Sequence, residues 1–143
     1  RIRDYCRKTN QDVPRNEAEI VRCINESLAF KYRIALEEIE DCTDKKYSKL
    51  YMLGGGTQSR LLSQMTANAC NIKVYGGPIE ATVLGNIAIQ LIASGNIKDL
   101  KEARRIINDS HNIDEYIPKE SKLWDKEFSR FKKIIKKGEL IKC

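Results

Sequence analysis

The segment at residues 79–94 constrains the fold of this chain most, because a helix formed there is apolar nearly all round. Such a helix must be covered on most of its sides by other parts of a protein. It is too short to span a bilayer, which takes about 20 apolar residues, and Asn86 and Gln90 interrupt it. We therefore expect a buried helix and no membrane partner, with Pro78 in the first turn and Gly95 at the C-terminal cap. The apolar positions are Ile79, Val83, Leu84, Ile87, Ala88, Ile89, Leu91 and Ile92.

A long helix is predicted after residues 1–15, which have no helical period and themselves predict a loop. Asn16 is a good N-cap, and Glu19, three residues later, completes a capping-box pattern. Apolar residues then recur at three- and four-residue steps to about Glu40, so one face of the helix is apolar. This face, like the helix at 79–94, predicts a sheet on which the helix lies.

Short strands and helices alternate along the rest of the chain. Only two strands are predicted, which is too few for a stable sheet, since three or more are usually needed. We therefore expect further strands from a segment upstream of residue 1. The buried side of the helix at 59–70 is predicted to carry Leu61, Leu62, Met65 and Ala69. The expected elements are strands at 49–53 and 72–75, helices at 59–70, 79–94, 98–108 and 121–137, and an extended piece at 113–118.

The net charge of +6 and the pI of about 9.1 raise the question of nucleic-acid binding. The excess of positive charge is uneven along the chain, and the aromatic residues beside it have the spacing of a helical packing stripe. A solvated helix face explains this pattern, so we expect no nucleic-acid partner. The lysines concerned are Lys132, Lys133, Lys136, Lys137 and Lys142, beside Trp124, Phe128 and Phe131.

The cysteines and the single histidine, His111, argue against metal chemistry. The cysteines are widely and irregularly spaced, without any CxxC pair, so neither a zinc ribbon nor another metal site is expected. We expect reduced thiols in a cytoplasmic protein, with Cys23 and Cys70 packed as small apolar residues. The five are Cys6, Cys23, Cys42, Cys70 and Cys143.

A run of three glycines at residues 54–56 is the strongest local signal of a binding site. It stands between a predicted strand and a predicted helix, where the backbone can approach a ligand closely and the helix N-terminus offers free N–H groups. The run lacks a glycine at Ser59, so it is not a dinucleotide fingerprint, and it lacks the Gly-Lys pair of a phosphate-binding P-loop. A tight turn without a ligand explains the glycines equally well.

A second signal follows the next strand, at residues 77–86. Glu80 is expected in the first turn of the helix, where the helix dipole favours an anion. Gly85 is expected inside the helix, where glycine costs about 1 kcal/mol relative to alanine. Either helix packing or a ligand close to the backbone accounts for that glycine.

These two motifs together resemble the FGGY family of carbohydrate kinases, which belongs to the actin/hexokinase-like ATPase superfamily. The resemblance rests on GGGTQSRLLSQMTANAC at 54–70 and GPIEATVLGNIAIQ at 77–90, in the family's order and separation. The segment from Tyr5 to Leu36 also fits the members that phosphorylate L-rhamnulose. The resemblance covers about residues 1–120.

The resemblance implies ATP-dependent phosphorylation of a sugar hydroxyl with Mg2+. It places the adenosine against Gly54, Gly55 and Gly56, with Ser59 near the adenine edge and Gln58 beside the ribose or purine. Arg60 is a weaker candidate, and Asn68 receives no role. The implied fold is α/β: a helix-rich, partial ribonuclease H-like (actin-like ATPase) domain at residues 1–120 with few strands, followed by a helical, basic tail at 121–143.

The resemblance also shows what this chain lacks. The family's catalytic aspartate, its phosphate-binding segments and its sugar-binding domain have no counterpart here, so no catalytic residue is assigned and the chain alone is expected to be inactive. Sugar is expected to bind through the missing N-terminal part. Exposed apolar surface predicts self-association or pairing with that part. A non-catalytic nucleotide-binding or scaffolding module with the same half-fold is the alternative.

Overall fold

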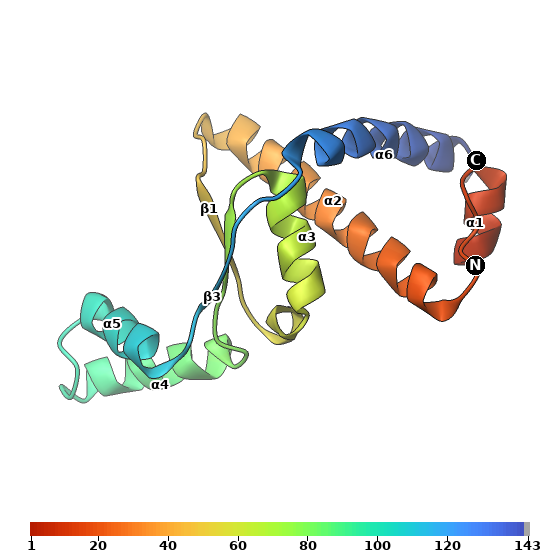
Figure 1. Cartoon of the computed structure of the whole chain (residues 1–143). Helices are drawn as coiled ribbons and strands as arrows, with labels where there is room; N and C mark the ends of the chain where they lie inside the picture. Colours follow the sequence, from red (N-terminus) through yellow and green to blue (C-terminus); the bar gives the residue numbers. More distant parts are fainter. Residues whose placement is uncertain (142–143) are drawn as a thin grey trace.

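The fold is α/β, with six α-helices and a three-stranded sheet in the described residues of the computed structural model (Figure 1). The structure describes residues 1–141, so Lys142 and Cys143 lie outside it. The elements are α1 (Ile2–Lys8), α2 (Glu17–Thr43), β1 (Lys49–Met52), the 3-10 helix η1 (Gly55–Gln58), α3 (Arg60–Cys70), β2 (Lys73–Gly76), α4 (Ala81–Ala93), α5 (Leu100–Ser110), β3 (Asp114–Tyr116) and α6 (Ser121–Ile141).

The predicted start of α2 and the predicted end of α4 are confirmed, whereas α4 begins at Ala81, so Pro78 does not lie in its first turn. The Asn16 side chain accepts a hydrogen bond from the Glu19 N–H over 2.9 Å and starts α2. Gly95 follows the last turn of α4 with φ of +80°, and its N–H donates to the Ile92 carbonyl over 3.0 Å. Both contacts satisfy backbone groups that a helix end leaves open.

The prediction of a loop over residues 1–15 is wrong for α1. This helix is held by tertiary contacts instead of a cap: Cys6 is 3% exposed, and the Tyr5 hydroxyl donates to the Ile134 carbonyl over 3.4 Å. A side chain at Gly138 of α6 would collide with the Tyr5 ring. The glycine therefore lets α1 lie directly against α6.

The sheet has the order β1-β2-β3, with β1 parallel and β3 antiparallel to β2. The predicted count of two strands is therefore corrected, because the extended piece at 113–118 supplies β3. Val74 is the centre of the register, paired with Leu50 on one side and Tyr116 on the other. β3 is a strand because it pairs with β2. Its own sequence is mostly polar, so the sequence alone did not predict a strand there.

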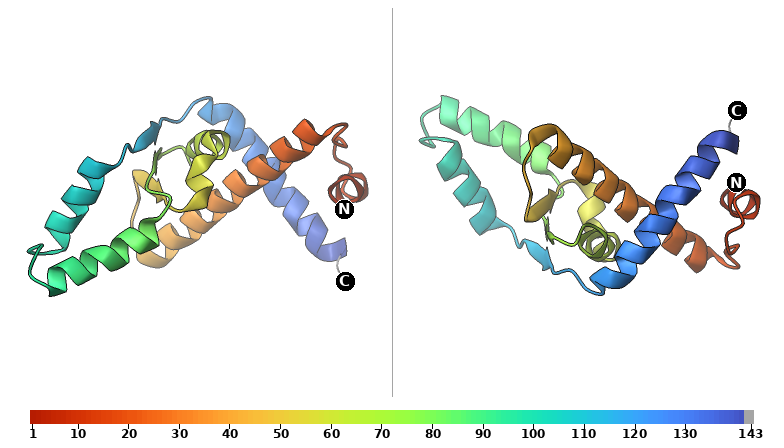
Figure 2. Two further views of the ribbon diagram at one scale, coloured as in Figure 1. Left: turned by 90° about the horizontal axis from the view of Figure 1, so that it is seen from below. Right: turned by 90° about the horizontal axis from the view of Figure 1, so that it is seen from above.

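The core consists of layers on one face of the sheet, first α3 and then α2 with α6. One cluster joins the strands to α3, and the other joins α3 to the two long helices, which cross each other in Figure 2. Leu61 was expected on the buried side of α3 but is 49% exposed, because the buried positions cluster around Leu62 and Met65. The clusters are Met52, Leu62, Ala67, Val74 and Tyr116, and Ala29, Phe30, Met65, Ala69 and Phe128.

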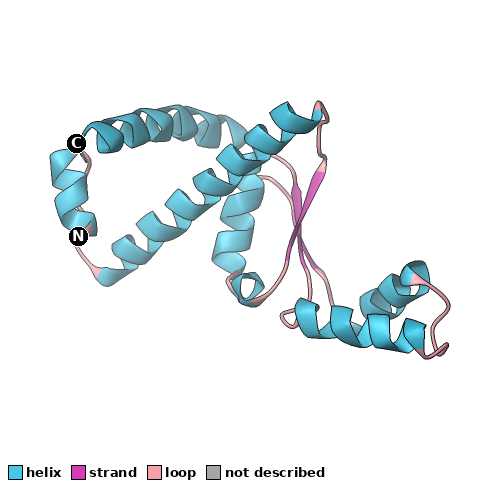
Figure 3. Cartoon of the chain, turned by 180° about the vertical axis from the view of Figure 1, so that it is seen from behind, coloured by secondary structure: helices cyan, strands magenta, loops and turns pink. Residues whose placement is uncertain are grey.

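Helices α4 and α5 form an arm at residues 81–110 that projects away from the other helices (Figure 3). Its buried residues are Ala88, Ile97 and Ala103, so α4 packs against α5. The prediction that this helix lies on the sheet and is covered on most sides is therefore not met within the described residues. Val83, Ile87 and Ile89 of α4 are exposed, and so is Ile79, which lies just before this helix.

Candidate functional site

The two glycine-rich turns meet at one edge of the sheet. We call the place where residues 52–54 contact residues 77–78 the joint of the turns. Because β1 and β2 are parallel, their carboxyl ends lie side by side, and each runs into one of the turns. The Gly77 N–H donates to the Met52 carbonyl over 2.8 Å, and the Gly54 N–H donates to the Pro78 carbonyl over 3.3 Å. Such edges of parallel sheets are preferred places for ligands.

The first turn is open on its outer side. Gly54 has φ of +80°, a conformation that favours glycine. A Cβ atom added at Gly55 or Gly56 would meet nothing within 4 Å. The space beside these two residues is therefore free for a ligand, and a larger side chain would fill it.

Two hydroxyl groups fix the path from the turn into α3. The Thr57 hydroxyl donates to the Gly54 carbonyl over 2.8 Å. Ser59 is the N-cap of α3, and its hydroxyl oxygen accepts from the Leu62 N–H over 3.3 Å. The hydroxyl hydrogen of Ser59 is then left to donate elsewhere. Gln58 and Arg60, the other predicted site residues here, are exposed.

Contacts to Gly77 were not foreseen from the sequence. A Cβ atom at this position would lie 2.5 Å from Cδ2 of Leu53 and 3.4 Å from the Met52 carbonyl oxygen. A side chain at position 77 would therefore push the exposed Leu53 side chain aside. The signal in the sequence was the second pair of glycines at residues 76–77, but only the parallel pairing shows what they face.

The other predicted positions lie apart from this joint or serve the fold. A Cβ atom at Gly85 would meet nothing within 4 Å, so no close packing within this chain explains that glycine. Glu80 is the N-cap of α4, without a side-chain cap bond, instead of lying in its first turn. Asn68 is buried and accepts from the Lys119 N–H over 2.9 Å, which ties the segment after β3 to α3.

The charged pairs with shifted pKa values lie away from the turns. Hydrogen bonding to Lys46 lowers the pKa of Glu40, and hydrogen bonding to Lys73 lowers that of Glu115. Among the side chains that the structure describes, no three of His, Cys, Asp or Glu converge as metal ligands would.

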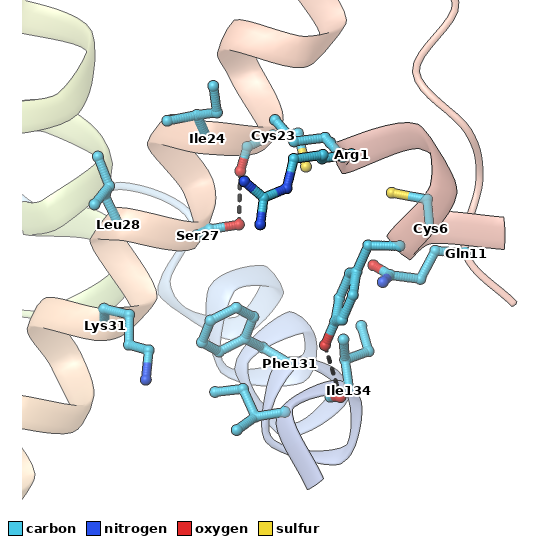
Figure 4. A pocket seen from close by; sticks show the side chains of 13 residues that line it. Arg1, Cys6, Gln11, Cys23, Ile24, Ser27, Leu28, Lys31, Phe131 and Ile134 are labelled. Carbon is cyan, nitrogen blue, oxygen red and sulfur yellow. Dashed lines mark hydrogen bonds between the residues drawn. The ribbon is translucent and has the colours of Figure 1, made fainter. Parts of the chain in front are cut away.

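A separate cavity of about 530 Å3 lies between α1, α2 and α6 (Figure 4). Leu28 and Phe131 form apolar parts of its wall, and Cys6 and Cys23 lie at the α1 side. Burial and the neighbouring Cys6 thiol raise the pKa of Cys23. None of the predicted nucleotide-site residues lines this cavity.

This chain belongs to the FGGY family of carbohydrate kinases, since the C-terminal domain of that family matches residues 2–94. Over 135 residues it is 41% identical to the rhamnulokinase of Bacteroides thetaiotaomicron, covering 94% of this chain and 28% of the relative. Over 119 residues it is 42% identical to the rhamnulokinase of Bacillus subtilis, covering 83% of this chain and 24% of the relative.

The chain thus spans about a quarter of the length of these relatives. Among its described residues, no helix has the length and apolar character needed to cross a membrane.

Proposed function

We propose that this chain is the ATP-binding, C-terminal portion of a kinase that transfers a phosphoryl group from ATP to L-rhamnulose. The observation that carries the proposal is the identity of 41–42% to two rhamnulokinases over most of this chain. The hydrogen-bonded joint between the two glycine turns supports it, because it lies at the carboxyl ends of two parallel strands. We also propose a cytoplasmic location, as for an enzyme of sugar metabolism.

In this proposal the adenosine lies against Gly54, Gly55 and Gly56, with Gln58 and Ser59 beside it. The open space at Gly55 and Gly56 suits a ligand that approaches the backbone. The free hydrogen of the Ser59 hydroxyl suits an acceptor atom of the ligand. ATP supplies the phosphoryl group, and this chain's residues bind and orient the nucleotide.

The remaining parts of the reaction are assigned to the rest of the longer kinase. Phosphoryl transfer depends on positioning and on stabilisation of charge at the γ-phosphate. We assign no catalytic base and no Mg2+ ligand to this chain, and the sugar is bound by the N-terminal part. We propose a ribonuclease H-like domain at residues 1–120, which the helix–strand–helix–strand–helix order from α2 to α4 supports, and a helical tail at 121–143.

The alternative is a non-catalytic nucleotide-binding or scaffolding module. Both versions leave the apolar residues of α4 exposed in this chain, and we propose that another copy or the rest of the kinase covers them. Sedimentation equilibrium tests this association, because a monodisperse monomer with a cooperative melt would contradict it. The gene's full reading frame separates the two functions: a kinase domain upstream supports the first.

A coupled assay of ADP release tests the assignment of the catalytic base. This chain is expected to show no L-rhamnulose-dependent turnover, even at high protein concentration. Sugar-dependent turnover that is lost on substitution of a residue in this chain would contradict the assignment.

A titration with ATP tests the binding site. Gly55→Phe is expected to abolish binding, because the ring occupies the open side of the turn. Gly85→Phe is the matched control, since the space beside Gly85 is also open but lies on the arm. Equal affinities of the two variants would place the nucleotide elsewhere.

A further inference from the structure

The residue just before the glycine turn is an exposed leucine. Leu53 follows β1 directly, and 58% of its surface is exposed. A single exposed leucine is common in proteins and requires no special role. The position of this one is unusual in two respects, its contact with Gly77 and its place beside the open turn.

The absence of a side chain at Gly77 leaves room for the Leu53 side chain to lie across it. Cδ2 of Leu53 occupies space that even a methyl group at position 77 would need, since that Cβ would be 2.5 Å away. The backbone there is held as well, because the Gly77 N–H donates to the Met52 carbonyl over 2.8 Å. An exposed apolar side chain is thus seated across a glycine at the joint of the two turns.

We propose that Leu53 forms an apolar wall for the base of the bound nucleotide, and that the lack of a side chain at Gly77 lets this wall lie there. This inference rests on the proposed nucleotide function and adds a residue that contacts the base to it. Sites for small molecules combine apolar walls with a few placed polar groups. Leu53 supplies the wall, while the turn beginning at Gly54 and the Ser59 hydroxyl supply the polar groups.

The role predicts which ligands respond to Leu53. An apolar wall contacts the face of a planar ring and not its polar edge, so adenosine and guanosine should gain equally from it. Inorganic pyrophosphate has no base and should gain nothing. Removal of roughly 50 Å2 of apolar contact corresponds to about a five- to tenfold loss of affinity.

The test is a set of titrations of the whole chain, followed by the backbone amide NMR signals. Leu53→Ser should weaken adenosine and guanosine binding by the same factor, about five- to tenfold. Any signal shifts that pyrophosphate causes should be the same in Leu53→Ser and in the unaltered chain. Leu123→Ser is the matched control, because Leu123 is 54% exposed but lies on α6, and it should bind all three probes as the unaltered chain does.

A double-mutant cycle tests the part played by Gly77. Gly77→Ala should displace Leu53 and weaken adenosine binding to a similar degree, while the double variant with Leu53→Ser should be no weaker than either single variant. Additive losses would contradict a shared role. Because Leu53 is exposed, the Leu53→Ser variant is expected to fold even if the Gly77→Ala variant does not.

The outcomes separate this inference from the proposed function. If adenosine moves no signals at residues 54–59 in the unaltered chain, the assignment of the nucleotide site is wrong, and so is the role of Leu53. If adenosine binds there and Leu53→Ser binds it equally well, the nucleotide site stands and the wall is wrong.

Discussion

The body of the molecule, formed by α2, α3, α6 and the sheet, differs from the arm of α4 and α5 in how apolar residues are covered. In the body, Phe128 of α6 lies between α2 and α3 and is 3% exposed. In the arm, α4 is the more apolar helix but buries only Ala88. The composition of a helix therefore determines how much apolar surface it has. The number of elements packed against the helix determines how much of that surface is buried.

The body is also held by charge around its aromatic centre. The Arg33 guanidinium lies 4.1 Å from the centroid of the Phe128 ring, donates to the Ala69 carbonyl and pairs with Asp125 over 2.6 Å. Lys132 lies 4.4 Å from the same ring centroid. These contacts join the helices that support the strand leading into the glycine turn, so the candidate site is built on the better-packed region.

The largest predicted effect is the loss of Phe128. Phe128→Ala is expected to lower the free energy of unfolding by about 3–5 kcal/mol, because it leaves a cavity and removes the ring beneath two cations. Urea unfolding measures the change. Leu123→Ala, on the exposed side of the same helix, should cost within about 0.5 kcal/mol. Equal costs would mean that α6 does not belong to the body.

The corresponding substitution in the arm is predicted to act locally. Ile97→Ala should cost about 2–3 kcal/mol, because Ile97 is buried between α4 and α5. Amide hydrogen exchange should detect the loss of protection in the arm and little change at α3. Ile89→Ala is the control, since Ile89 is exposed on α4. Equal loss of protection at α3 would show that the arm and the body unfold together.

The comparison also explains what the sequence could predict. Asn16 and Glu19 predicted the start of α2 correctly, because a helix cap depends only on residues that are close in sequence. Helix α1 has no side-chain cap, and β3 has no alternation of apolar residues, so both needed tertiary partners to be recognised. The burial of α4 was overestimated, because a pattern shows which residues are apolar and not whether a neighbour is present.

The candidate site was foreseen in part. The glycines at residues 54–56 mark a backbone that can approach a ligand, and this is visible in the sequence. The contact between Gly77 and Leu53 depends on the parallel pairing of β1 and β2, which brings two separate turns together. No pattern of residues within either turn predicts that the two strands pair.

A smaller effect is expected in the chemistry of the cysteines. Burial raises the pKa of Cys70, which lies at the end of α3 in the body, to about 12. About one thiol in ten thousand is then ionised at pH 8, and the thiolate is the reactive form. Iodoacetamide at pH 8 should therefore modify exposed Cys42 first. In urea the two rates should converge, and equal rates in the folded chain would contradict the burial.

The central claim is that the two turns, joined at the end of the parallel strands, form one nucleotide site. Titration of the labelled chain with ADP, followed by amide NMR signals, tests this most directly. We predict that signals of residues 54–59 and 77–79 move together with a single affinity, while those of the arm beyond Ala88 remain in place. Movement confined to the lysines of α6, such as Lys133 and Lys137, would contradict the claim.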